Sequence, residues 1–185
     1  MPSPDYLSAA PSALERSLAV QVAAAGKSFP DGTRALAPID LSVHRNEFLS
    51  LIGPSGCGKS TLLRMMAGLL SSSEGRVRTA PGKLGFVFQD ATLMPWATVQ
   101  ANVGLPLHLS HQERGSARER VGRALAAVGL SDVAEKRPRE LSGGMRMRAS
   151  IARALVDEPA LMLMDEPFGA LDEITRGKLD ADLLD

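Results

Sequence analysis

Apolar positions along the chain form short runs and alternating stretches that predict β-strands. Residues 18–22 predict a first strand, and residues 39–43 alternate apolar and polar side chains as a half-buried strand does. Residues 47–52 predict another strand, which ends at a glycine-rich loop. Residues 85–88 and 161–164 are short apolar runs, and the second is typical of a strand buried on both faces of a parallel sheet.

Helical patterns separate these predicted strands. Residues 61–70 are so rich in Leu and Met that they predict a buried helix with little polar face. Residues 116–128 place apolar side chains on one helical face and end before Gly129, a plausible stop signal. Residues 142–156 predict a helix that begins with two glycines. Strands that alternate with helices predict an α/β fold, whereas the order of the strands in the sheet stays open.

Composition and charge narrow the class of protein. With 185 residues the chain is long enough for one domain with a substantial core. The sequence is 44% hydrophobic and 23% charged, which is typical of a globular protein and excludes wholesale disorder. Lys+Arg and Asp+Glu both number 21, so no overall basic field favours nucleic acid or anionic lipid as a partner.

Cysteine content and the N-terminal residues indicate the compartment. Cys57 is the only cysteine, so the chain cannot form an internal disulfide, as is usual in a reducing compartment. Apolar runs are too short to predict a membrane span. Residues 1–17 make a poor signal peptide and, with their Pro, Ser and Ala, predict a flexible tail. We therefore expect a cytoplasmic protein that can still dock on a membrane protein.

A glycine-rich loop carries the clearest chemistry. The segment GPSGCGKS matches the pattern G-x-x-x-x-G-K-[ST], in which backbone N–H groups surround phosphate oxygens at the start of a helix. Lys59 would contact the β- and γ-phosphates and the Ser60 hydroxyl would ligate Mg²⁺. The alternative is a simple turn between a strand and a helix. The expected nucleotide-binding residues are Gly53, Pro54, Ser55, Gly56, Cys57, Gly58, Lys59, Ser60 and Thr61.

Two acidic residues end the last apolar run. Asp165 directly follows residues 161–164, which places its carboxylate at the edge of the sheet where ligands of open α/β sheets bind. Asp165 would hold Mg²⁺, and Glu166 would act as the general base for an attacking water. Alone, the pair would be read as two acidic residues that merely end a strand.

The segment LSGGM at residues 141–145 opens a predicted helix, where Ser142 could simply be an N-cap. The order of motifs along the chain favours a functional role for this segment as well. These motifs are the phosphate loop, Gln89 after a strand, LSGGM, and LMLMDEP. In combination they resemble the ATP-binding subunit of ABC transporters, from about residue 18 to the last residue. The resemblance implies an α/β P-loop NTPase core with a small antiparallel β part, and a helical subdomain at about residues 90–145.

The resemblance also implies roles for residues outside the loop. Two copies would pack head to tail, with Ser142, Gly143 and Gly144 of one copy on the ATP bound by the other. Gln89 would contact Mg²⁺, take part in catalysis and face the membrane subunit. Phe29 would stack on adenine, with a core or turn role as the alternative. Residues 169–172 resemble the D-loop that links the two sites.

Residues 91–96 and 165–172 resemble the importer branch for nitrate, sulfonate, taurine or bicarbonate. This implies a transmembrane permease as partner, a solute-binding protein as an indirect partner, and a place on the inner face of the cell membrane. Trp96 would anchor a groove on the permease or, equally, fill a core. A soluble ABC ATPase of DNA repair or translation is disfavoured by the short spacing between Lys59 and Ser142, and a phosphate-loop kinase does not need LSGGM.

The sequence departs from the family pattern at three places. Asn46 replaces a glycine, which an asparagine tolerates well, and Met147 replaces a glutamine after LSGGM. Family members also continue beyond the position of Asp185, through another strand and a switch-loop histidine. The third departure predicts impaired hydrolysis, so the alternative function is a truncated remnant that only binds ATP or its permease.

Overall fold

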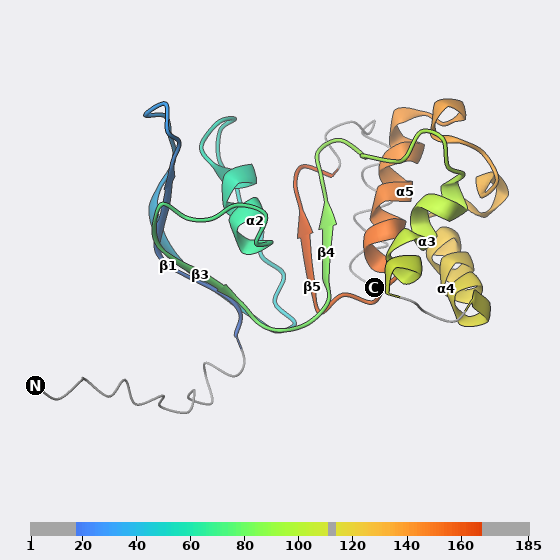
Figure 1. Cartoon of the computed structure of the whole chain (residues 1–185), viewed down its shortest axis with the longest axis horizontal. Coiled ribbons are helices and arrows are strands. Elements are labelled where there is room, and N and C mark those ends of the chain that lie inside the picture. The colour runs from blue at the N-terminus through green and yellow to red at the C-terminus, as the bar shows by residue number, and fades with distance from the viewer. Residues whose placement is uncertain (1–17, 111–113, 168–185) are drawn as a thin grey trace, which may run out of the picture. The chain divides into compact units, whose positions relative to one another are not determined.

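The computed structural model describes residues 18–110 and 114–167 (Figure 1). The chain divides into two compact units, Met1–Pro81 and Gly82–Asp185, and each is considered by itself. The predicted tail at residues 1–17 and the D-loop motif at residues 169–172 lie outside the described residues.

An antiparallel sheet forms most of the first unit. Its strands are β1 (Leu18–Ser28), β2 (Arg34–His44) and β3 (Glu74–Thr79), in the order β2-β1-β3. The central strand buries Val20, Val22 and Ala25 almost completely. Both strands predicted at residues 18–22 and 39–43 are confirmed, and each is longer than its apolar core because backbone pairing continues past it. This sheet is the small antiparallel part that the family resemblance implies.

Helix α2 (Lys59–Met66) packs against this sheet in the first unit. It buries Leu62, Leu63, Met65 and Met66, which confirms the predicted buried helix. The predicted C-terminal end at residue 70 is wrong. Gly68 adopts φ +71°, a left-handed conformation that ends the helix, and Leu69 is 59% exposed beyond it.

The strand predicted at residues 47–52 is also wrong. These residues join neither sheet of the part of the chain that the structure describes. Their side chains are not buried either, since Phe48 is 85% exposed and Ile52 is 94% exposed. An apolar run favours burial, but a strand also requires a backbone partner at each ladder position, and hydrophobicity does not supply one. The phosphate loop therefore follows an irregular segment.

A parallel strand pair and three helices form the second unit. The strands are β4 (Leu84–Val87) and β5 (Leu161–Met164), with Val87 paired to Met164. The α-helices are α3 (Val99–Leu109), α4 (Arg114–Ala127) and α5 (Gly143–Leu155), and short 3₁₀ turns lie at η1 (Ser131–Val133) and η2 (Pro138–Glu140). Figure 1 shows α5 beside β4, with α3 and α4 packed on its other side.

The core of the second unit joins the helices to β4. Its most deeply buried apolar side chains are Val87, Val99, Val103, Leu107, Leu130 and Ile151. The predicted strands at residues 85–88 and 161–164 and the predicted helices at residues 116–128 and 142–156 are confirmed within two residues at each end. Gly129 adopts φ +64° and ends α4 as predicted. Parallel strands with flanking helices confirm the α/β class.

Candidate functional site

Lys59 lies across the glycine-rich loop. Its Nζ atom donates hydrogen bonds to the carbonyl oxygens of Gly53, at 2.9 Å, and Pro54, at 3.1 Å. The ammonium group is thus held over the loop, where an anion bound by the backbone N–H groups would meet a positive charge. The N-cap residue of α2 is Gly58, which has no side chain to cap the helix, and a helix N-terminus of this kind favours an anionic ligand.

Two glycines give the loop its shape. Gly56 has φ +79° and Gly58 has φ +102°, both in the left-handed region. A Cβ atom on Gly58 would lie 2.7 Å from the carbonyl oxygen of Ala35 and 2.8 Å from the Leu36 side chain, whereas nothing lies within 4 Å of a Cβ on Gly56. Gly58 is therefore required both by its backbone conformation and by the close approach of β2.

Gly58→Ala is expected to lower the free energy of unfolding by about 2–4 kcal/mol, because left-handed strain adds to a clash with backbone. Gly56→Ala is the matched control and should cost about 1–2 kcal/mol, because its Cβ meets only open space. Urea unfolding of both variants measures the difference. Equal losses would show that the contact with β2 does not restrict position 58.

The other residues predicted for the loop lie at its surface or at the start of α2. Pro54, Ser55 and Cys57 are exposed, and Ser60 and Thr61 are half-buried. Phe29 is 40% exposed at a tight turn, where its N–H donates to the Thr33 carbonyl and its ring lies 5.5 Å from Lys27 Nζ. This exposure argues against a core role, and stacking on adenine stays a prediction.

The second unit brings Gln89 and two carboxylates to one edge of its sheet. Gln89 follows β4, and Asp165 and Glu166 follow β5, so the carboxyl ends of two parallel strands carry all three. The Gln89 amide donates to a carboxylate oxygen of Glu166 at 3.4 Å. Asp165 is 3% exposed, and its backbone N–H donates to the Val87 carbonyl at 2.9 Å. The sequence predicts that these three residues lie together only if the two strands are parallel neighbours, and β4 and β5 are parallel neighbours in the structure.

Glu166 has φ +49°, a left-handed backbone that is rare for a residue with a side chain. Such strain persists where the surroundings impose it. Asp165 and Glu166, adjacent in sequence, therefore occupy different environments: one carboxylate is buried and the other is exposed.

The residues predicted to hold Mg²⁺ suit that ion. Asp165 offers a buried carboxylate, Ser60 a half-buried hydroxyl and Gln89 an amide oxygen. Among the described residues no group of three or more His, Cys, Asp or Glu could hold a metal by itself. Mg²⁺ usually takes one or two protein oxygens and completes its shell with water and phosphate, so the oxygen donors of each unit, considered by itself, are of the kind that this ion prefers.

The N-terminus of α5 carries the LSGGM segment. Ser142 caps the helix, since its hydroxyl oxygen accepts from the Met145 N–H at 3.2 Å, which confirms the capping interpretation. Ser142 and Gly143 are exposed, so the same turn is accessible to a ligand. Met147 is 2% exposed and packs in the core, so the departure at this position places a thioether in the interior and not at the surface.

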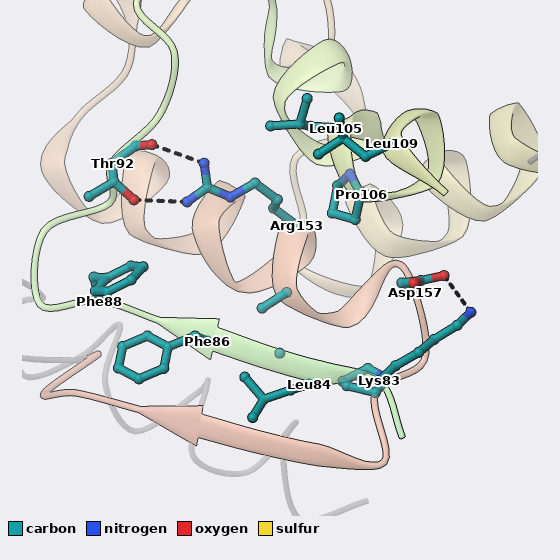
Figure 2. Close-up of a pocket in the computed structure, with 13 residues that line it drawn as sticks. Lys83, Leu84, Phe86, Phe88, Thr92, Leu105, Pro106, Leu109, Arg153 and Asp157 are labelled. Carbon is teal, nitrogen blue, oxygen red and sulfur yellow. Dashed lines mark hydrogen bonds and ion pairs between the residues drawn. The ribbon is translucent and has the colours of Figure 1, made fainter. Parts of the chain in front are cut away.

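A cavity of about 400 Å³ lies between β4, α3 and α5 (Figure 2). Its apolar lining includes Phe86 and Phe88, whose ring centroids are 4.3 Å apart, and Leu105. Arg153 reaches from α5 into this region and donates to the Thr92 carbonyl at 2.9 Å. Burial lowers the pKa of the Arg153 guanidinium from its ordinary value. The sequence prediction missed Arg153, because α5 carries three arginines and no pattern distinguishes this one from the other two.

Comparison with known proteins identifies the family. A family model described as ABC transporter matches residues 36–169. The chain belongs to the ABC transporter family.

Two relatives within the family are 46% and 48% identical to this chain over the segments that align. The aliphatic sulfonates import ATP-binding protein of Pseudomonas savastanoi is 48% identical over 83% of this chain and 62% of its own length. The nitrate import ATP-binding protein of Synechocystis is 46% identical over 84% of this chain and 25% of its own length. The chain thus spans less than two thirds of the length of these ABC relatives.

Solved structures of ABC cassettes have the same fold. A dimeric structure of an ATP-binding cassette in a post-hydrolysis state, bound to ADP and Pi, is 33% identical with a TM-score of 0.81, over 89% of this chain and 81% of that one. The predicted family and the predicted ABC fold are therefore confirmed. No helix among residues 18–110 and 114–167 is long and apolar enough to cross a membrane.

Proposed function

We propose that this chain is the ATP-binding and ATP-hydrolysing subunit that energises an ABC importer for a small anion such as nitrate, sulfonate or taurine. The observation that carries the proposal is the contact between Gln89 and Glu166 beside the buried Asp165. Hydrolysis requires a base that can orient water, and a motif for phosphate binding alone would not include one. The relatives named for sulfonate and nitrate import support the class of solute.

Each residue has a defined part in the proposed reaction. Lys59 and the N–H groups of the loop bind the β- and γ-phosphates, and Glu166 holds the attacking water and accepts its proton. Ser60, Gln89 and Asp165 would hold Mg²⁺, which neutralises phosphate charge when bound. Positioning and electrostatic stabilisation supply most of the rate enhancement in phosphoryl transfer, so the exact placement of Gln89 and Glu166 matters.

A second copy of the chain is the proposed partner at the nucleotide. Ser142, Gly143 and Gly144 of one copy would contact the γ-phosphate bound by the other. Two observations support this arrangement. The first turn of α5 exposes Ser142 and Gly143, and the related cassette bound to ADP and Pi is dimeric. Helix N-termini favour anions, which explains two such ends in one chain.

Trp96 is proposed to contact the permease at the inner face of the membrane, and the solute-binding protein acts through that permease. Trp96 is 73% exposed, which excludes the core role. Buried Asn102 holds the turn that carries it: its side chain accepts from Met94 N at 2.7 Å and donates to the Thr98 carbonyl at 2.9 Å. A large aromatic on a rigid exposed turn is a typical interface anchor.

Trp96→Ala is expected to lower the fraction of the chain that sediments with membranes, with about tenfold weaker association, because anchors of this kind dominate interface energy. ATP binding should stay unchanged, since Trp96 belongs to no part of the proposed nucleotide site. Leu69→Ala, which shortens another exposed apolar side chain, is the control. Equal membrane association of Trp96→Ala and the unaltered chain would contradict this role.

Uptake by the source organism tests the function as a whole. Disruption of the gene should abolish ATP-dependent uptake of labelled nitrate, taurine or an alkanesulfonate, and the unaltered chain should restore it. The Glu166→Gln chain should not restore it. Unchanged uptake of all these anions after disruption would contradict the importer assignment.

A further inference from the structure

We propose that Arg153 is a positioning residue for Gln89: it fixes the backbone that follows Gln89 and so keeps this amide against Glu166. The inference rests on the proposed function, because its effect appears in ATP turnover. It adds to the catalytic arrangement a residue that belongs neither to the phosphate loop motif nor to LSGGM.

Arg153 bonds two consecutive residues, Ala91 and Thr92, and Figure 2 shows its two hydrogen bonds to Thr92. One guanidinium nitrogen donates to the Thr92 carbonyl at 2.9 Å, and the other donates to the Thr92 hydroxyl at 2.9 Å and the Ala91 carbonyl at 3.1 Å. A guanidinium presents its donors in a fixed planar fork, so three such bonds define position and orientation together. Lysine carries the same charge without this fork.

The segment that follows Gln89 depends on side-chain hydrogen bonds to hold its conformation. Residues 88–98 contain neither helix nor strand, so no backbone ladder holds them. Thr92 has φ +46°, an uncommon conformation for a β-branched residue that persists only where the surroundings impose it. Arg153 bonds both the carbonyl and the hydroxyl of this strained residue. It does so from α5, a helix whose Ala149, Ile151 and Ala152 are fully buried in the core and which is therefore a rigid base.

Partial burial of Arg153 strengthens its hydrogen bonds to Ala91 and Thr92. Arg153 is half-buried between α5 and the segment, and the same desolvation lowers the pKa of its guanidinium. Hydrogen bonds from a charged donor are stronger than neutral ones, and reduced solvent access strengthens them further. The three carbonyl and hydroxyl oxygens replace the water that the guanidinium has lost.

Gln89 is only two residues before Ala91 along the chain, and its contact with Glu166 is 3.4 Å long. That distance is near the outer limit of a hydrogen bond, so a small shift of the segment separates the two side chains. Loss of the Arg153 fork should therefore lower the rate of hydrolysis. Binding of ATP should persist, because Lys59 and the glycine-rich loop belong to the other unit of the chain.

Arg153→Lys tests the inference, with kcat and the Kd for MgATP measured separately. We expect kcat to fall about tenfold and Kd to change less than twofold, since the charge remains and two or more aligned hydrogen bonds are lost. Arg148→Lys is the matched control: Arg148 lies on the same helix and donates to the Val128 carbonyl at 3.0 Å, away from Gln89. It should leave kcat unchanged.

Thr92 provides a second test that does not alter Arg153. Thr92→Ala removes the hydroxyl that Arg153 bonds and should lower kcat, whereas Thr92→Ser retains the hydroxyl and should restore most of it. Unchanged kcat in Arg153→Lys, or parallel losses of kcat, ATP affinity and thermal stability, would overturn the positioning role. Absence of turnover in the unaltered chain would instead contradict the proposed function itself.

Discussion

Glu166→Gln is expected to lower kcat for ATP hydrolysis by a factor of about 100 or more, with ATP binding retained. A general base contributes on the order of 10²–10⁴ to the rate, and an amide cannot accept the proton of the attacking water. Glutamine has the same shape as glutamate and can still bond the Gln89 side chain, which lies 3.4 Å from Glu166. The loss should therefore appear in turnover and not in affinity.

Phosphate release under saturating MgATP measures this effect, with Glu158→Gln as the control. Glu158 is also an exposed glutamate with a left-handed backbone, at φ +48°, but it lies between α5 and β5 and not at the carboxyl end of a strand. Its substitution should leave kcat unchanged. Wild-type turnover in the Glu166→Gln chain would show that Glu166 is not the base.

Lys59→Ala is expected to weaken ATP binding about 10–100-fold, because a hydrogen bond to a charged group contributes about 1.5–3 kcal/mol. The substitution removes the ammonium group that donates hydrogen bonds to the carbonyl oxygens of Gly53 and Pro54 in the loop. Hydrolysis should fall with it, since in the proposed reaction the same ammonium would stabilise the charge that develops on the transferred phosphate.

Calorimetric titration with MgATP measures the affinity, and Lys83→Ala serves as the control. Lys83 pairs with Asp157 at 2.7 Å and belongs to the other unit of the chain. Its removal should leave Kd unchanged. If Lys59→Ala bound ATP as tightly as the unaltered chain, the assignment of the loop to phosphate would be contradicted.

Spacing along the sequence predicts where most residues of the candidate site lie on the elements of the fold, because local backbone geometry determines those positions. The glycine pattern around Lys59 and the acidic pair after residues 161–164 depend on one loop and one strand, which local sequence determines. The same patterns predict that Lys59 lies at the start of a helix and that Asp165 and Glu166 lie at the end of a strand. The edge where Gln89 meets Glu166 requires only that β4 and β5 be parallel neighbours.

The failed strand predictions share a physical cause, namely that pairing partners distant in sequence decide whether a segment joins a sheet. Residues 47–52 have the composition of a strand but join neither described sheet, whereas β3 carries a single apolar side chain, Val77, and still pairs with β1. Helix α3 escaped prediction because Gly104 and Pro106 interrupt its pattern. The hydrogen bonds from Arg153 to Thr92 depend on the positive φ of Thr92, which no residue pattern predicts.

The central claim is that ATP bound by the loop of one copy is also held by Ser142, Gly143 and Gly144 of a second copy. Sedimentation velocity of the Glu166→Gln chain, with and without MgATP, tests it most directly because the nucleotide is not consumed. We expect a monomer without nucleotide and a dimer with saturating MgATP. A monomer under both conditions, with ATP binding demonstrated in the same sample, would contradict the shared site.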